Sequence, residues 1–195
     1  MDSQFKKSFQ FLTMSDKYLN LVKNVLDENV KQGNLHIITS DEEIFEKDYE
    51  EKTKWSDFNI FPILFNFYHG LELLLKGLLS LKESYVLRSK HHIDNLFDDF
   101  KKEYADEKEM VLILEKYLIL DLMPDLLANC VRANNLEIKN LYEFFRYPYD
   151  VDFKKSHNYI GLKHRKEDGR IFFQELSKDI SFLLKEAINL LRINL

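Results

Sequence analysis

Residues 59–83, NIFPILFNFYHGLELLLKGLLSLKE, form the most apolar stretch of the chain and decide its fold. Asn59 can cap a helix at the start of this stretch, and Pro62 falls in the first turn, where a missing backbone N–H costs little. The apolar residues surround such a helix on nearly every side, so neighbouring elements must cover most of it. The sequence therefore predicts a central, buried helix over residues 59–83.

Three polar side chains interrupt this apolar helix. His69, Glu72 and Lys76 are three and four residues apart, so they share one helix face. Glu72 and Lys76 also have the favourable order for an ion pair. A lipid-facing span would not tolerate these groups cheaply, so we expect a soluble protein with no membrane partner. The face is either an exposed stripe or buried pair that serves packing, or a polar line along a ligand-binding cleft.

Two glycines lie one heptad apart on the same helix, at Gly70 and Gly77. Each costs about 1 kcal/mol relative to alanine in a helix interior, so a close backbone approach must compensate for them. The approaching element is either a neighbouring helix of the same chain or the helix of a twofold partner.

Composition favours a helical domain. The chain has 195 residues, enough for one domain over residues 1–195 with a core of its own. It has 5 Gly and 3 Pro, where average usage would give roughly 23 of the two together, which argues against β-sandwiches and glycine-rich phosphate loops. A single cysteine, Cys130, excludes an intramolecular disulfide and a multi-cysteine zinc site, and we interpret it as a core residue. Residues 1–7 lack the apolar core of a signal peptide, so we expect a cytoplasmic protein.

Apolar periodicity predicts further helices on both sides of the central one. They cover residues 4–32 with a break near residues 13–15, 92–104, 107–134 with an interruption or a kink at Pro124, 136–145 and 171–194. Residues 41–57 hold eight acidic residues and three lysines, and residues 146–170 hold seven basic and four acidic residues. We therefore expect an all-α domain with one acidic and one basic connecting loop. The acidic run is either a solvated loop with a short helical piece or an interaction surface.

The segment FFRYPYD at residues 144–150 places an arginine among aromatic residues at a predicted helix end. Arg146 can stack on Tyr147 or Tyr149 and bind a phosphate through two parallel hydrogen bonds. Alternatively, it offsets the helix dipole or pairs with an acid such as Glu72.

The histidines outside the central helix give weaker indications of a metal or catalytic site. His91 and His92 precede a predicted helix together with Asp94, but adjacent residues of a helix point in different directions, so we expect packing or capping and no metal site. His157 and His164 lie in the basic loop, where they either serve acid–base chemistry or are solvated, and we expect solvation.

The sequence FYHGLELLLKGLL at residues 67–79 resembles the core helix of the HEPN superfamily. Residues 92–97, HIDNLF, resemble the start of the family's following helix, and residues 145–148, FRYP, resemble a step found in some of its branches. The resemblance implies an up-and-down bundle of four to five main helices that forms a homodimer and needs no cofactor. Many members are metal-independent ribonucleases of bacterial defence or toxin–antitoxin systems, and others bind nucleotides, RNA or partner proteins.

Active members of that superfamily carry an arginine followed after four to six residues by a histidine. The arginine stabilises the charge on the phosphorane, and the histidine moves a proton. In this chain ten residues separate Arg146 from His157, which are the candidate catalytic residues. Either His157 reaches Arg146 through the loop, or Tyr149, Asp150 or Asp152 stands where the histidine would be. The candidate ligand-binding residues are His69, Glu72, Lys76, His92, Tyr147, Tyr149 and Asp150.

These observations favour a dimeric module that binds RNA or a nucleotide, with metal-independent RNA cleavage left open. The net charge of −5 argues against a basic protein that coats nucleic acid. The alternative is a non-catalytic interaction module whose acidic residues, at 41–57 or 94–109, dock a basic partner protein. A small-molecule or metal enzyme that uses His69, Glu72 and His92 is a third hypothesis, which no residue spacing demands.

Overall fold

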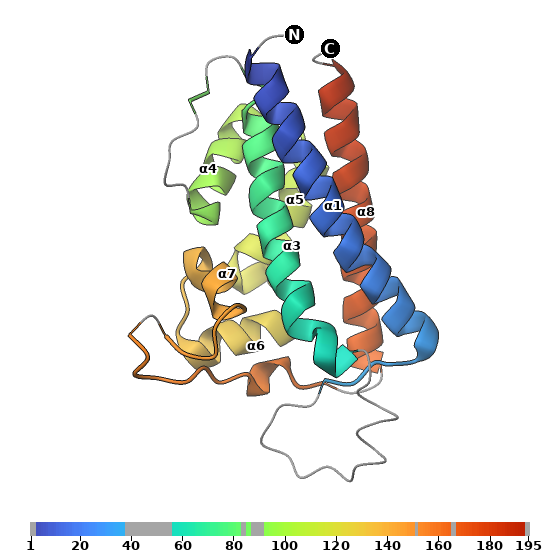
Figure 1. The fold of residues 1–195 in the computed structure, drawn as a ribbon, viewed down its shortest axis with the longest axis vertical. Coiled ribbons are helices and arrows are strands. Elements are labelled where there is room, and N and C mark those ends of the chain that lie inside the picture. The colour runs from blue at the N-terminus through green and yellow to red at the C-terminus, as the bar shows by residue number, and fades with distance from the viewer. Residues whose placement is uncertain are drawn as a thin grey trace.

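The computed structural model describes residues 3–37, 56–82, 85–86, 92–150, 152–164 and 167–193, and within these ranges the chain is helical (Figure 1). The predicted all-α class is confirmed, since the described ranges contain only two isolated β-bridges besides helices. The α-helices are α1 (Ser3–Gln32), α3 (Ser56–Leu79), α4 (Ile93–Glu103), α5 (Lys108–Leu118), α6 (Asp125–Asn134), α7 (Leu141–Phe144) and α8 (Glu167–Ile193). Short 3-10 helices are η1 (Leu120–Leu122), η2 (Ile138–Asn140) and η3 (Ile160–Leu162).

The three longest helices run alongside one another (Figure 1). Among the shorter α-helices, α4 and α7 contact α3, and α5 contacts α8. Helix α1 contacts both α3 and α8, and it is antiparallel to each of them. The central helix is buried as the sequence predicts, and its Leu64, Leu71 and Leu78 are fully buried. Its predicted bounds of 59–83 are wrong, because α3 begins at Ser56 and ends at Leu79. Asn59 therefore lies inside the helix instead of capping it, and Pro62 lies beyond the first turn. No helix among the described residues combines the length and the apolar character needed to cross a membrane.

The two glycines of α3 mark the closest approach of α1. A Cβ atom on Gly70 would lie 2.7 Å from Leu19 Cδ2, and one on Gly77 would lie 2.6 Å from Leu12 Cδ2. Real Cβ atoms do not approach other carbon atoms so closely, so only glycine fits at both positions without a shift of the neighbour. Of the two predicted alternatives, a neighbouring helix of the same chain is the one that approaches these glycines.

Two serines of α1 hold this contact together by hydrogen bonds. Ser8 Oγ donates to the carbonyl of Gly77 at 2.7 Å, and Ser15 Oγ donates to the carbonyl of Gly70 at 2.8 Å. Both pairs are buried and lie seven residues apart on each helix, which fits an antiparallel packing. The predicted break at residues 13–15 is wrong because the Ser15 hydroxyl bonds to α3, and α1 continues without interruption.

The predicted interruption at Pro124 is confirmed, since residues 107–134 form two α-helices joined by η1, and Pro124, which lacks a backbone N–H, immediately precedes α6. Another predicted boundary differs from the structure. Helix α8 begins at Glu167, four residues before its predicted start, and the basic loop is shorter accordingly. Glu167 and Asp168 in its first turn favour this start, since negative charge stabilises a helix N-terminus. Residues 41–55 of the predicted acidic run lie outside the described residues.

Hydrogen bonds tie the chain after α7 to the rest of the domain. Asn134 Nδ2 donates to the Asn158 carbonyl at 2.6 Å, and the Asn158 N–H donates to Asn134 Oδ1 at 2.7 Å. The Tyr159 hydroxyl lies 3.2 Å from the carbonyl oxygen of Phe144 and 3.0 Å from that of Tyr147, within donating distance of both. These contacts fix Asn158 and Tyr159 against α6 and the end of α7.

Candidate functional site

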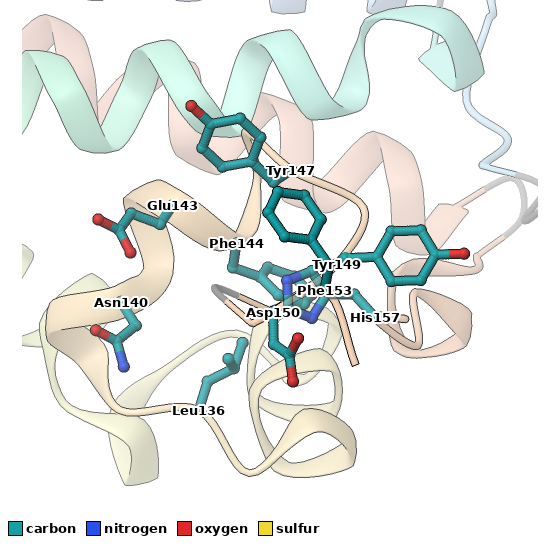
Figure 2. Close-up of a pocket in the computed structure, with 9 residues that line it drawn as sticks. All are labelled: Leu136, Asn140, Glu143, Phe144, Tyr147, Tyr149, Asp150, Phe153 and His157. Atoms are coloured by element: carbon teal, nitrogen blue, oxygen red, sulfur yellow. The ribbon is translucent and has the colours of Figure 1, made fainter. Parts of the chain in front are cut away.

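A pocket of about 390 Å³ opens between η2, α7 and the loop that follows α7 (Figure 2). It is lined by Leu136, Asn140, Glu143, Phe144, Tyr147, Tyr149, Asp150, Phe153 and His157. Figure 2 shows the Tyr147 and Tyr149 rings on opposite sides of the group, with Phe153 and His157 between them. The structure thus brings together four residues that the sequence singles out, namely Tyr147, Tyr149, Asp150 and His157.

The loop that follows α7 is folded back on itself. Tyr149 and Ser156 form an isolated antiparallel β-bridge, and between them Asp150 Oδ1 accepts the backbone N–H groups of Lys154 at 2.8 Å and Lys155 at 3.3 Å. The hydrogen bond from Lys154, followed by that from Lys155, holds the pKa of Asp150 below its usual value. Asp150 therefore stays ionised and holds the shape of the loop.

This fold of the loop places His157 in the pocket. Its backbone N–H donates to the Pro148 carbonyl at 2.9 Å, and its ring packs on Phe144 with the centroids 4.6 Å apart. Burial lowers the pKa of His157, and the Asp150 carboxylate and a hydrogen bond to the Tyr149 backbone oppose this only in part. The imidazole is therefore neutral at pH 7 and able to accept a proton. The side chain is half-buried against the Phe144 ring, so the expectation of a solvated side chain is met only in part.

Arg146 lies next to the pocket without lining it. The guanidinium carbon lies over the Tyr147 ring, 5.0 Å from the ring centroid, and the residue is exposed. No carboxylate within the described ranges lies within ion-pairing distance of it, and the alternative pairing with Glu72 is not formed because Glu72 pairs with Lys76. The side chain is held by its aromatic neighbour and keeps its charge available to an anion.

His69, Glu72 and Lys76 form a second group of polar side chains, on one face of α3. Glu72 and Lys76 make an ion pair, and the His69 Nδ1 atom lies 4.0 Å from Glu72 Oε2. The three side chains are between 21% and 25% exposed, so the face is half-buried and neither an open stripe nor a sealed pair. Tyr18 meets the His69 ring edge-on at 4.7 Å, and Tyr142 lies 5.5 Å away. Burial is the main cause that lowers the pKa of His69.

A second pocket, of about 210 Å³, brings Glu72 and His92 together. It is lined by Tyr68, Glu72, His92, Ile93, Lys139, Asn140, Tyr142 and Glu143. His69 and Lys76 do not line it, so the structure separates the members of the predicted ligand-binding set. Asn140 and Glu143 line both pockets and form the wall that the two share.

Sequence reasoning missed Asn140, Glu143 and Phe153. The first two have a detectable signal, because Asn140, Glu143 and Tyr147 are three and four residues apart and so share one face of the η2–α7 turn. Phe153 has no such signal. Its backbone adopts a left-handed conformation with φ of 56°, and its side chain is 76% exposed, neither of which the residue type predicts.

His92 and His164 lie outside the aromatic pocket, and His91 lies outside the described residues. His92 is exposed at the start of α4 and makes no side-chain cap, so the predicted capping role is not observed. His164 is 8% exposed, and its Nδ1 atom lies 2.7 Å from the Leu162 carbonyl oxygen. The expectation of a solvated side chain is therefore wrong for His164. Among the described residues, no group of three or more His, Cys, Asp or Glu is arranged to hold a metal ion.

Comparisons with known proteins find no matching family model, no matching curated sequence and no matching solved structure. The resemblance of residues 67–79 to the HEPN superfamily therefore stays a prediction from the order and spacing of motifs. The pocket and the charges around it are the basis on which a function can be argued.

Proposed function

We propose that this chain binds single-stranded RNA or a nucleotide, with a base in the aromatic pocket and a phosphate on Arg146. The observation that carries the proposal is the group of exposed rings beside a stacked arginine. Tyr147 and Tyr149 are each 45% exposed and Phe153 is 76% exposed. Aromatic rings left open to solvent at one site are the platforms on which proteins stack unpaired bases, and a guanidinium plane beside them suits a phosphate.

The charge around the pocket limits the number of phosphate contacts. Lys154 and Lys155 are exposed in the same loop, but Lys154 Nζ lies 3.1 Å from Asp152 Oδ2 and is partly neutralised. With a net charge of −5, the chain as a whole repels a polyanion. Stacking therefore supplies most of the binding free energy, and the salt dependence should reflect about one to three phosphate contacts.

The contacts on α4 weaken the case for an acidic docking surface. Asp98 pairs with Lys101 at 3.0 Å, and Asp99 pairs with Lys102 at 3.6 Å. The Tyr85 hydroxyl also donates to Asp99 at 2.9 Å. Acids that are paired within their own helix offer little charge to a basic partner, so the aromatic pocket is the better supported site.

Metal-independent RNA cleavage is a second candidate function, favoured by the neutral His157 in the same pocket. In this reaction His157 removes the proton of a ribose 2′-hydroxyl, the 2′-oxygen attacks the phosphorus, and the 5′-oxygen leaves with a proton from solvent. The products are a 2′,3′-cyclic phosphate and a 5′-hydroxyl. Arg146 would stabilise the extra negative charge of the phosphorane. A HEPN-like homodimer in a bacterial defence or toxin–antitoxin system is the setting that the motif resemblance supports.

The test compares wild-type protein with Arg146→Ala on a labelled single-stranded RNA hexamer of mixed sequence in EDTA. Fluorescence anisotropy should show binding that weakens about tenfold in the variant, with a salt slope reduced by about 0.7. Arg192→Ala, which removes an exposed arginine from the last turn of α8, is the matched control. Equal affinity of both variants would overturn the site, and absence of binding by wild type would overturn the function. Electrophoresis of the same samples detects cleavage.

A further inference from the structure

The charged side chains that line the aromatic pocket are both carboxylates, which accept hydrogen bonds. Glu143 and Asp150 contribute carboxylates, Asn140 contributes an amide, and neither lysine nor arginine lines the pocket. We infer, as a refinement that rests on the proposed function, that the pocket binds guanine in preference to other bases and that Glu143 recognises its Watson–Crick edge.

Glu143 lines the aromatic pocket from the end of α7, and Tyr147 lines it from the loop that follows. The Tyr147 N–H donates to the Glu143 carbonyl at 3.1 Å, which fixes the backbone of these two residues relative to each other. The Glu143 side chain is exposed, and no hydrogen bond or ion pair involves its carboxylate within the described ranges. Figure 2 shows Glu143 and Asn140 projecting from the same turn on one side of the ring group.

Asp150 cannot substitute for Glu143 in this role. Its Oδ1 atom already accepts two backbone N–H groups of the loop, which holds the carboxylate in a fixed position. Glu143 is therefore the carboxylate with both oxygens available to a ligand. The pocket volume of about 390 Å³ falls within the range of small-molecule sites and suits a single base with its ribose.

The chemistry of the bases makes a free carboxylate selective. Guanine presents two adjacent donors, the N1–H and the 2-amino group, that match the two oxygens of one carboxylate. Adenine and cytosine present one donor beside an acceptor on that edge, and uracil presents one donor between two acceptors. An ionised carboxylate repels each of those acceptors. A good bidentate contact of this kind discriminates by about tenfold or more.

The experiment measures the binding of U-rich RNA hexamers that differ only at one central base. That base is guanine, inosine, 2-aminopurine or adenine, so that each of the two donors is removed singly and then both together. We expect guanine to bind about tenfold more tightly than adenine, with inosine and 2-aminopurine between them. In Glu143→Gln the difference between guanine and adenine should fall below twofold, because an amide pairs with a donor and an acceptor. Glu109→Gln, an exposed change of equal charge on α5, should retain the preference.

The possible results distinguish the failure of guanine selection from the failure of RNA binding. Equal binding of all four hexamers, with Arg146→Ala still weakening them, would overturn guanine selection and leave RNA binding intact. A guanine preference that survives Glu143→Gln would overturn the role of this residue. If no hexamer binds, both statements are wrong. Thermal unfolding of Glu143→Gln, expected to match wild type because the side chain is exposed, shows that the variant is folded.

Discussion

Gly77→Ala tests the contact between α1 and α3 on which the fold depends. The added Cβ would lie 2.6 Å from Leu12 Cδ2 and 3.1 Å from the Leu12 backbone nitrogen, so the neighbour cannot yield by rotating its side chain alone. Overpacking of this kind costs about 1–3 kcal/mol. Parting the helices also lengthens the buried hydrogen bond from Ser8 to the Gly77 carbonyl, worth about 1 kcal/mol.

One effect acts in the opposite direction. Alanine is favoured over glycine in a helix by about 1 kcal/mol, so an uncrowded site would become more stable on this substitution. The net expectation is a loss of about 1–2 kcal/mol in the free energy of unfolding, which lowers Tm by about 2–8 °C. Urea denaturation followed by circular dichroism measures the free energy. A variant as stable as wild type would contradict the close approach.

A double-mutant cycle with Leu12→Ala tests whether the loss of stability in Gly77→Ala comes from the contact with Leu12. Leu12→Ala alone should cost about 2–5 kcal/mol because it leaves a cavity at the same contact. In the double variant the new methyl group at position 77 occupies part of that cavity, so the combined loss should be at least 1 kcal/mol smaller than the sum. Losses that add within about 0.5 kcal/mol would mean that the two sites do not touch.

Three further predictions concern titration, the cysteine and the loop. Burial lowers the pKa of His157 and His164 from 6.5, so the unfolded chain binds more protons below about pH 6.5 and the urea midpoint should fall as pH falls there. NMR titration midpoints at or above 6.5 would contradict this. Burial raises the pKa of Cys130 to about 12, so a disulfide reagent should react at least about a hundredfold more slowly with native than with urea-unfolded protein. Asn134→Ala removes both hydrogen bonds to Asn158, and we expect a loss of about 1–3 kcal/mol by urea denaturation together with weaker RNA binding.

The sequence predicted the central helix well because its apolar residues leave no other arrangement. It also predicted that a close helix neighbour explains Gly70 and Gly77, but it could not say which chain supplies that neighbour. The structure shows that α1 of the same chain is this neighbour. Ser8 and Ser15 of α1 have the same seven-residue spacing as the two glycines, and their hydrogen bonds to Gly77 and Gly70 show this match. Boundaries were less predictable, since a proline or a capping acid decides them locally.

Of the residues that line the aromatic pocket, the sequence singled out Tyr147, Tyr149, Asp150 and His157 and missed Asn140, Glu143 and Phe153. Tyr147, Tyr149 and Arg146 attract attention because bulky rings and a cation adjoin a proline. Glu143 resembles any other exposed acid of a short helix, and only the structure shows that it lines the aromatic pocket. The distinction between Glu143 and Asp150 is likewise invisible in the sequence, because only the structure shows which carboxylate accepts backbone N–H groups.

The spacing of Arg146 and His157 shows why distance along the chain is a poor measure of a site. Ten intervening residues argue against a shared function if the chain between them is extended or helical. Here the bridge between Tyr149 and Ser156 closes the loop, so His157 returns to the pocket wall formed by Tyr147, the residue on which Arg146 stacks. In the proposed ribonuclease, a motif defined by a short interval on a helix would be replaced by a longer interval on a hairpin. The residues that hold the hairpin then become as necessary as the pair itself.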